Sequence, residues 1–93
     1  MTLAIDISGS GDVTASGRTD ALALEINGSG DADLSRLSTT DADVDINGSG
    51  DARIAPTGRA DITISGSGDV DVTTRPATVN QNISGSGDVD LRG

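Results

Sequence analysis

The chain has 93 residues and a formal net charge of −9, from fifteen Asp and Glu against six Arg, and it contains no Lys, His, Cys, Phe, Tyr or Trp. This acidity argues against nucleic-acid binding, which needs clustered cations, and the lack of Cys and His removes disulfides, thiolate chemistry and the commonest general base. No apolar run approaches the ~18 residues of a membrane span, so no membrane insertion is expected.

One tetrapeptide, Gly-Ser-Gly-Asp, recurs along the chain. Its five copies lie at 9–12, 28–31, 48–51, 66–69 and 85–88, at intervals of 19, 20, 18 and 19 residues. Self-similarity at a fixed period is the signature of a repeat architecture. Low hydrophobicity with high charge is also typical of disordered chains, but the strict period favours a fold. We therefore expect residues 1–93 to form a single domain of repeated coils centred on these tetrapeptides.

An alternating apolar pattern precedes each tetrapeptide and resumes after it. Alternation with a period of two indicates strands that bury one face. The position two residues before the first glycine is Ile in every copy, and these residues form the predicted structural core: Ile7, Ile26, Ile46, Ile64 and Ile83. Gln81 is an exception on an inward position. Because a buried amide needs hydrogen-bond partners, its coil is expected to be frayed or shifted in register.

The pattern predicts an all-β fold, a single-stranded parallel β-helix or β-solenoid of about five coils. Each coil is expected to contain two short strands, a Gly-Ser-Gly-Asp turn between them, and a polar turn of variable length. The variable turns are expected at 16–19, 35–40, 56–59 and 74–76. One coil alone has too few apolar residues for a core, whereas stacking at ~4.8 Å joins them into one. A core without aromatic residues must be narrow, which favours a solenoid over a sandwich.

The aspartates that close the tetrapeptides should stack in a column: Asp12, Asp31, Asp51, Asp69 and Asp88. The simpler interpretation is conformational, because glycine supplies positive φ and Asp accepts hydrogen bonds in turns. The alternative is a calcium site, since stacked carboxylates repel one another and calcium prefers oxygen ligands. These aspartates are weak metal candidates, with a partial resemblance to the Gly- and Asp-rich nonapeptides of calcium-binding toxin repeats. No other cofactor is expected.

The repeated segments resemble the head GIN domain family, which is named for autotransporter adhesins. The residues that carry the resemblance are 7–13, 26–32, 46–52, 64–70 and 83–89. The resemblance implies a bacterial protein of the cell envelope or exterior, a stack of short strands, and a role in adhesion. The chain itself shows no export signal, because residues 1–6 lack a basic start and an apolar stretch.

The expected function is therefore a non-catalytic structural or adhesive module with a cell-surface or glycan partner. Carboxylate pairs can hydrolyse glycosides, but no aromatic wall or apolar pocket is expected to raise the pKa of one acid. Two alternatives remain, a filament subunit that polymerises end to end and a calcium-dependent binding repeat. The first follows from the expected ends of the solenoid, which lack a cap and favour a homo-oligomer.

Overall fold

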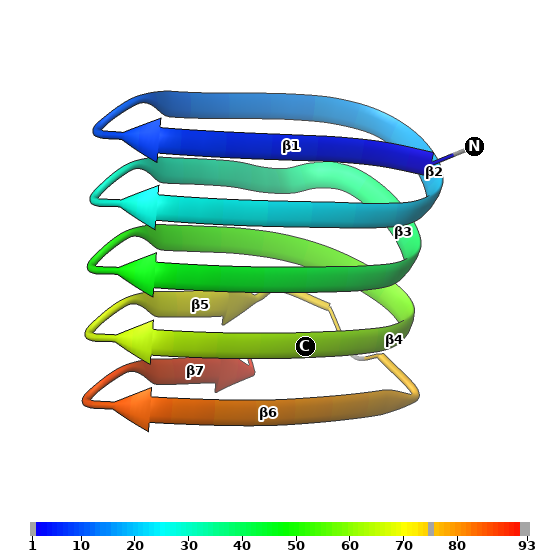
Figure 1. Cartoon of the computed structure of the whole chain (residues 1–93). Helices are drawn as coiled ribbons and strands as arrows, with labels where there is room; N and C mark the ends of the chain where they lie inside the picture. The colour runs from blue at the N-terminus through cyan, green and yellow to red at the C-terminus, as the bar shows by residue number, and fades with distance from the viewer. Residues whose placement is uncertain (1, 75, 92–93) are drawn as a thin grey trace.

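The computed structural model describes residues 2–74 and 76–91 and shows a parallel all-β solenoid of about five coils (Figure 1). Its strands are β1 (Thr2–Gly9), β2 (Asp12–Gly28), β3 (Asp31–Gly48), β4 (Asp51–Gly66), β5 (Asp69–Val72), β6 (Thr78–Gly85) and β7 (Asp88–Leu91). The sheet order is β1-β2-β3-β4-β5-β7, and β6 pairs with β4. The predicted fold class is confirmed. No helix among the described residues is long and apolar enough to cross a membrane.

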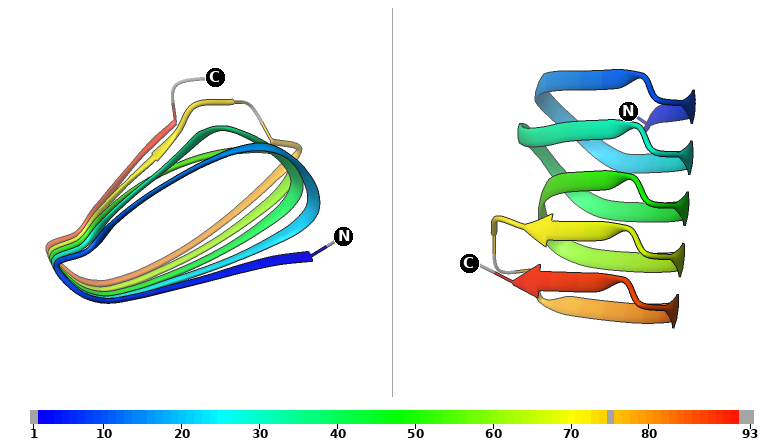
Figure 2. Two further views of the ribbon diagram at one scale, coloured as in Figure 1. Left: turned by 90° about the horizontal axis from the view of Figure 1, so that it is seen from above. Right: turned by 90° about the vertical axis from the view of Figure 1, so that its left-hand side faces the viewer.

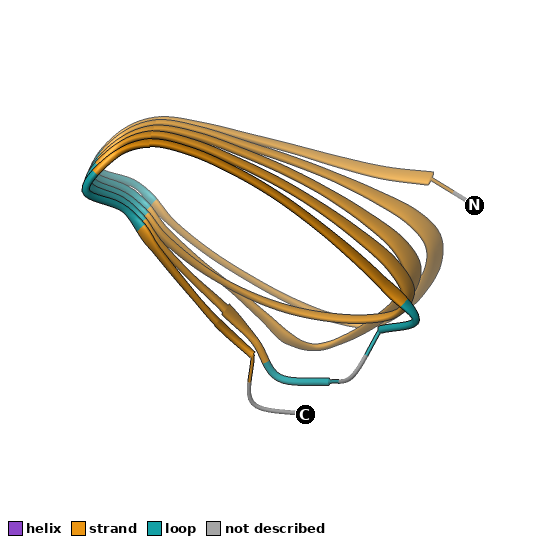
Figure 3. Ribbon diagram, turned by 90° about the horizontal axis from the view of Figure 1, so that it is seen from below, coloured by secondary structure: helices purple, strands orange, loops and turns teal. Residues whose placement is uncertain are grey.

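Each coil lies in register with the next, so that equivalent residues stack. The first glycine of every tetrapeptide pairs with its counterpart, from Gly9 through Gly28, Gly48 and Gly66 to Gly85. Viewed along the stack, the coils superpose as a wedge with a narrow corner and a wide end (Figure 2). The narrow corner contains the stacked tetrapeptide loops, whereas the loop between β5 and β6 lies away from that corner, as Figure 3 shows by colour. The tetrapeptides therefore form one edge of the molecule.

Continuous strands replace most of the predicted variable turns. β2, β3 and β4 each run from one tetrapeptide to the next, over 17, 18 and 16 residues. Shifts in register at Thr14/Ser16, Asp33/Ser38 and Thr39/Asp41 absorb the differences in coil length. The prediction of two short strands per coil is therefore wrong for the first coils and holds only where β5 and β6 are separate. The predicted turn at 74–76 lies between them, with Arg75 outside the described residues.

The two glycines of the tetrapeptide meet different requirements. The first has positive φ in every copy, between 87° and 120°, which glycine adopts without steric cost. The second leaves room for the coil before it. A Cβ at Gly30 would lie 2.4 Å from Cγ2 of Ile7 and 2.6 Å from the carbonyl oxygen of Gly11. Gly50, Gly68 and Gly87 receive the isoleucine of the preceding coil in the same way. Each Ile is thus a knob that fits a glycine of the next coil.

The predicted core column is buried except at its last member. Ile7 is 4% exposed, and Ile26, Ile46 and Ile64 are fully buried, whereas Ile83 is 36% exposed. The prediction that Ile83 is buried is wrong because no described coil follows it and supplies a glycine. Gln81 also lies on this last coil. It pairs with Ile62 without a shift in register and is exposed.

The wide end of the wedge is closed by residues that the repeat did not reveal. Leu37, Ala55 and Pro56 are buried there, together with two threonines. Thr19 and Thr39 pair in register, and each hydroxyl donates to the carbonyl oxygen two residues later, at 3.2 and 2.7 Å. These bonds satisfy the buried hydroxyls, as burial requires. The variable segments therefore bury part of the core and are not merely polar turns.

Ile46→Asp should abolish folding, because it places an unpaired carboxylate in the centre of the Ile column. Ile83→Asp is the matched control, since the exposed edge of the last coil lets the new charge reach water. Circular dichroism and thermal melting measure both outcomes. The assignment of the core is wrong if Ile46→Asp melts like the native chain, or if the two variants lose stability equally.

Candidate functional site: the outer columns

Stacking turns each outward position into a column of similar side chains. The column at the narrow corner is the predicted one, because Asp12, Asp31, Asp51, Asp69 and Asp88 pair in register. Their backbone amides join the coils, with Asp31 N donating to Gly11 O at 3.1 Å and Asp51 N to Gly30 O at 3.2 Å. All five residues are exposed. The backbone of the motif therefore joins the coils, and its aspartate residues lie on the exposed surface of the corner.

Like charge accumulates in the middle of this aspartate column. Burial of part of the carboxyl group raises the pKa of Asp51, and the neighbouring charges of Asp31 and Asp69 raise it further. Two unit charges one strand spacing apart repel by about 0.9 kcal/mol even in water. The column therefore opposes stacking slightly, and the backbone ladder and the Ile–Gly contacts outweigh it.

The carboxylates of the aspartate column are spread along the rod. Within the ranges 2–74 and 76–91, no three carboxylates converge closely enough to hold a metal ion. The carboxylates instead line a groove of about 310 Å³ with residues of the adjoining column. Parallel stacking places the acids side by side along the rod, whereas a calcium site surrounds its ion with six to eight oxygens.

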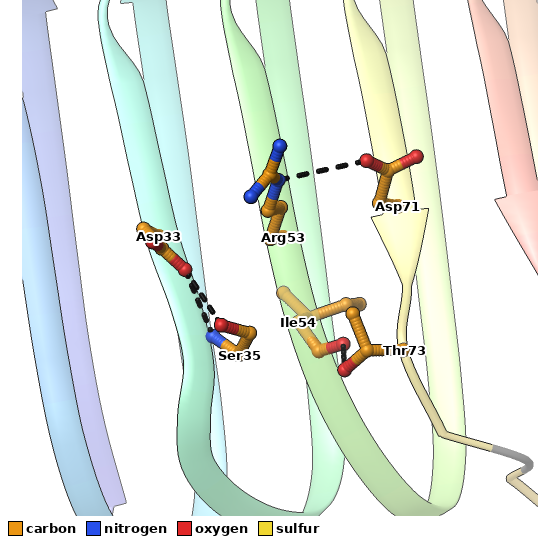
Figure 4. Close-up of polar contacts among 6 residues, drawn as sticks. All are labelled: Asp33, Ser35, Arg53, Ile54, Asp71 and Thr73. Carbon is orange, nitrogen blue, oxygen red and sulfur yellow. Dashed lines mark hydrogen bonds and ion pairs between the residues drawn. The ribbon is translucent and has the colours of Figure 1, made fainter. Parts of the chain in front are cut away.

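The adjoining column mixes charges along the strands that follow the tetrapeptide. Asp33, Arg53, Asp71 and Asp90 pair in register in that order. Nε of Arg53 lies 3.6 Å from Oδ2 of Asp71 (Figure 4). One coil before Arg53, Oδ1 of Asp33 accepts from the hydroxyl and backbone amide of Ser35, at 2.8 and 3.3 Å. These bonds lower the pKa of Asp33. Arg53 interrupts the acids of this column.

The flat face of the strands before the tetrapeptide presents three polar columns. They are Ala4, Ala23, Asp43, Asp61 and Asn80; Asp6, Glu25, Asp45, Thr63 and Asn82; and Ser8, Asn27, Asn47, Ser65 and Ser84. Side-chain amides connect neighbouring coils here. Nδ2 of Asn47 donates to Oδ1 of Asn27 at 3.3 Å, and Nδ2 of Asn80 donates to Oδ1 of Asp61 at 2.8 Å.

A groove of about 430 Å³ crosses this flat face. The small side chains of Ala4 and Ala23 leave the space, and acids border it: Asp6, Glu25, Asp43 and Asp45. The repeat gives no sign of this groove, because the groove depends on two alanines that stack next to the acids. A shallow trough bordered by carboxylates suits a ligand with hydroxyl or cationic groups. It provides no enclosed apolar pocket for a small molecule.

Comparison with known proteins identifies a family. Residues 1–76 match the model of the family described as "Putative auto-transporter adhesin, head GIN domain". The match includes the first four tetrapeptides and ends before the fifth, at 85–88. A search of curated proteins and a search of solved structures found no match.

Asp51→Asn should raise the melting temperature at neutral pH. Because the pKa of Asp51 is higher in the folded chain than in the unfolded chain, protonation of this carboxyl stabilises the fold below about pH 4. This stabilisation is lost as the pH rises through the pKa of the folded state. At pH 7 the native chain therefore carries an unfavourable charge that Asn removes, and the gain should vanish in acid.

Asp33→Asn is the matched control, with the opposite sign. Because the pKa of Asp33 is lower in the folded chain than in the unfolded chain, its ionised carboxylate stabilises the fold at neutral pH. This stabilisation is lost as the pH falls through the pKa of the folded state. The variant should therefore melt earlier at pH 7. Equal effects of the two substitutions would contradict the electrostatic description of these columns.

Millimolar calcium should change the melting temperature only slightly and no more than magnesium at equal ionic strength, because the aspartates do not converge on one point. Calorimetric titration with calcium provides a second measurement. A rise of many degrees that Asp51→Asn removes would instead establish a calcium site in the aspartate column.

Proposed function

This chain belongs to the head GIN domain family, and we propose from that premise that it is a non-catalytic adhesive module of a bacterial surface or envelope protein. The solenoid is the rigid part of the module, and the outer columns are the parts that meet a partner. The observation that carries this proposal is the family match, combined with in-register columns that repeat the same polar groups along one face.

The chemistry of the outer columns supports a role without catalysis. Paired carboxylates act as acid and base when their environments move their pKa values apart. The aspartates of the tetrapeptides are all exposed residues. The pKa of Asp51 is raised by partial burial and by the like charges of Asp31 and Asp69, with no partner carboxylate of lowered pKa beside it among the described residues of the column. The chain has no His or Cys that would serve as a base or nucleophile.

The repetition of the columns suits a polymeric partner. Asp, Glu and Asn side chains accept hydrogen bonds from hydroxyl groups, and Asn also donates. Groups repeated at one strand spacing of about 4.8 Å offer several weak contacts to one chain of repeating units. Once one contact has formed, the others form at a high effective concentration. The overall affinity can therefore be high although each single contact is weak. We infer that the partner is an uncharged, hydroxyl-rich glycan of a cell surface, and that it lies along the flat face.

The net charge restricts the partner further. A chain with a net charge of −9 repels anionic lipids and nucleic acids at low ionic strength. Uncharged glycans pay no such penalty. The absence of aromatic residues from the sequence removes the stacking surface that would strengthen a single sugar site. Adhesion through this face should therefore depend on many copies of the module or on a long glycan.

Beads that carry the chain should be retained on neutral polysaccharide surfaces under flow. Replacing Ala77, an exposed loop residue, by Cys gives one coupling point, because the sequence has no other cysteine. Changing Asp6, Glu25 and Asp45 to their amides should weaken retention several-fold, since amides bind hydroxyls less strongly than carboxylates do.

The control for this experiment changes Asp33, Asp71 and Asp90 to Asn, which removes the same charge from the other face. It should leave retention unchanged once both variants are shown to be folded. If native beads are not retained on any surface of the panel above beads that carry an unrelated acidic protein, the adhesive role is wrong. Equal losses in the two triple variants would reject the flat face.

A further inference from the structure

The first and last coils of the solenoid are complementary to each other. In the interior, each tetrapeptide donates two backbone bonds to the coil before it, for example Ser29 N to Gly9 O at 3.0 Å and Asp31 N to Gly11 O at 3.1 Å. Among residues 2–74 and 76–91, the amides of Ser10 and Asp12 and the carbonyl groups of Gly85 and Gly87 have no equivalent partner. One end thus offers the donors and the other end the acceptors of the same ladder.

The side chains at the two ends complement each other as well. Ile83 lies on the last coil and is 36% exposed, because no described glycine of a following coil packs against it. Gly11 on the first coil is the glycine with no isoleucine from a preceding coil, and a Cβ there would meet only Ile7 Cγ2, at 3.9 Å. Ile83 and Leu91, at 36% and 54% exposure, are the exposed large hydrophobic residues of the described chain, and both lie on the last coil.

A junction between the last coil of one copy and the first coil of another would contain fewer acid–acid pairs than the junction between the first two coils of one chain. In the interior, the first coil meets the second with two acid–acid pairs, Asp6 with Glu25 and Asp12 with Asp31. Continuing the same register from the last coil to another first coil would keep only one, Asp88 with Asp12. The other position would join Asn82 to Asp6. Asn80 already makes such an amide–carboxylate bond to Asp61, at 2.8 Å.

We propose that copies of this chain associate head to tail, with the last coil of one copy (β6 and β7) stacked on the first coil of the next (β1 and the start of β2). Ile83 then fits against Gly11 of the second copy, and Gly85 O and Gly87 O accept from its Ser10 N and Asp12 N. The contact is heterologous, so it does not close and gives linear oligomers. This inference goes beyond adhesion and does not depend on the glycan partner.

Gln81 limits the strength of this contact. Continuing the register places Gln81 over Ile5 of the next copy, on the column that contains Leu24, Val44 and Ile62 in the interior. An amide on this apolar column loses its hydration and finds no partner on Ile5, which has an alkyl side chain. The association should therefore be weak, and high salt should promote it by screening the net charge, since the Debye length is about 3 Å at 1 M salt.

Sedimentation and electron microscopy over a series of concentrations and salt strengths test the proposal on the 93-residue chain. The weight-average mass should rise with both variables as a series of linear oligomers. Gly11→Ala should abolish the rise without changing the melting temperature, because the added methyl group fills the hole on the first coil and meets only ordinary contact within its own coil. Gln81→Leu should strengthen the association.

A complementation experiment identifies the interface. Gly11→Ala blocks the first coil and Ile83→Asp blocks the last coil, so each variant alone should be monomeric. An equimolar mixture of the two retains one intact contact and should form a heterodimer that does not grow further. A native chain that stays monomeric at high concentration and high salt overturns the proposal. So does a Gly11→Ala chain that associates like the native one, or a mixture that stays monomeric while the native chain associates.

The experiment separates this inference from the proposed function. The blocking substitutions lie at the ends of the stack and leave the outer columns unchanged, so immobilised Gly11→Ala should still be retained on glycan surfaces. A native chain that self-associates but is not retained on any glycan surface contradicts only the adhesive role. Normal retention of a strictly monomeric native chain contradicts only the head-to-tail contact.

Discussion

The contact between the isoleucine of one coil and the second glycine of the next is the constraint on which the structure depends. A Cβ at Gly50 would lie 2.6 Å from both Ile26 Cγ2 and the carbonyl oxygen of Gly30. Any larger residue there would push two coils apart and break the parallel ladder locally. The contact therefore fixes the register of each coil, and a fixed register is what places chemically similar residues above one another at every other position.

In-register stacking explains the electrostatic cost that the molecule tolerates. The same geometry that aligns Ile26 with Ile46 also aligns Asp31 with Asp51. The pKa of Asp51 is raised first by burial and then by the charges of the stacked Asp31 and Asp69, and the second effect reflects this electrostatic cost. Exposure keeps each repulsion near the value for water, whereas burial of the Ile column yields about 1.5–3 kcal/mol for each side chain. Apolar stacking can therefore support charged columns on the surface, which also discourage sideways pairing between sheets.

The sequence predicts those features that repeat in every coil. The period locates the coils, the alternation identifies Ile7, Ile26, Ile46 and Ile64 as core residues, and the tetrapeptide places the aspartate column at one corner. Features that occur once or twice carry no such signal. Thr19 and Thr39 are buried because their hydroxyls bond to the backbone two residues later. Their separation of 20 residues, which equals one coil interval, was the only available hint.

The exposure of Ile83 shows why position in the stack decides what a repeated residue does. Ile64 and Ile83 are both followed by Ser-Gly-Ser-Gly-Asp-Val-Asp, yet Ile64 is fully buried and Ile83 is 36% exposed. The difference follows the neighbouring coil, since Gly87 receives Ile64 and no described glycine receives Ile83. In a structure where each coil contacts only its neighbours, stability is a sum of junctions between coils. A junction between two copies is then governed by the same contacts as a junction within one chain, and Gln81 is the residue that makes the two unequal.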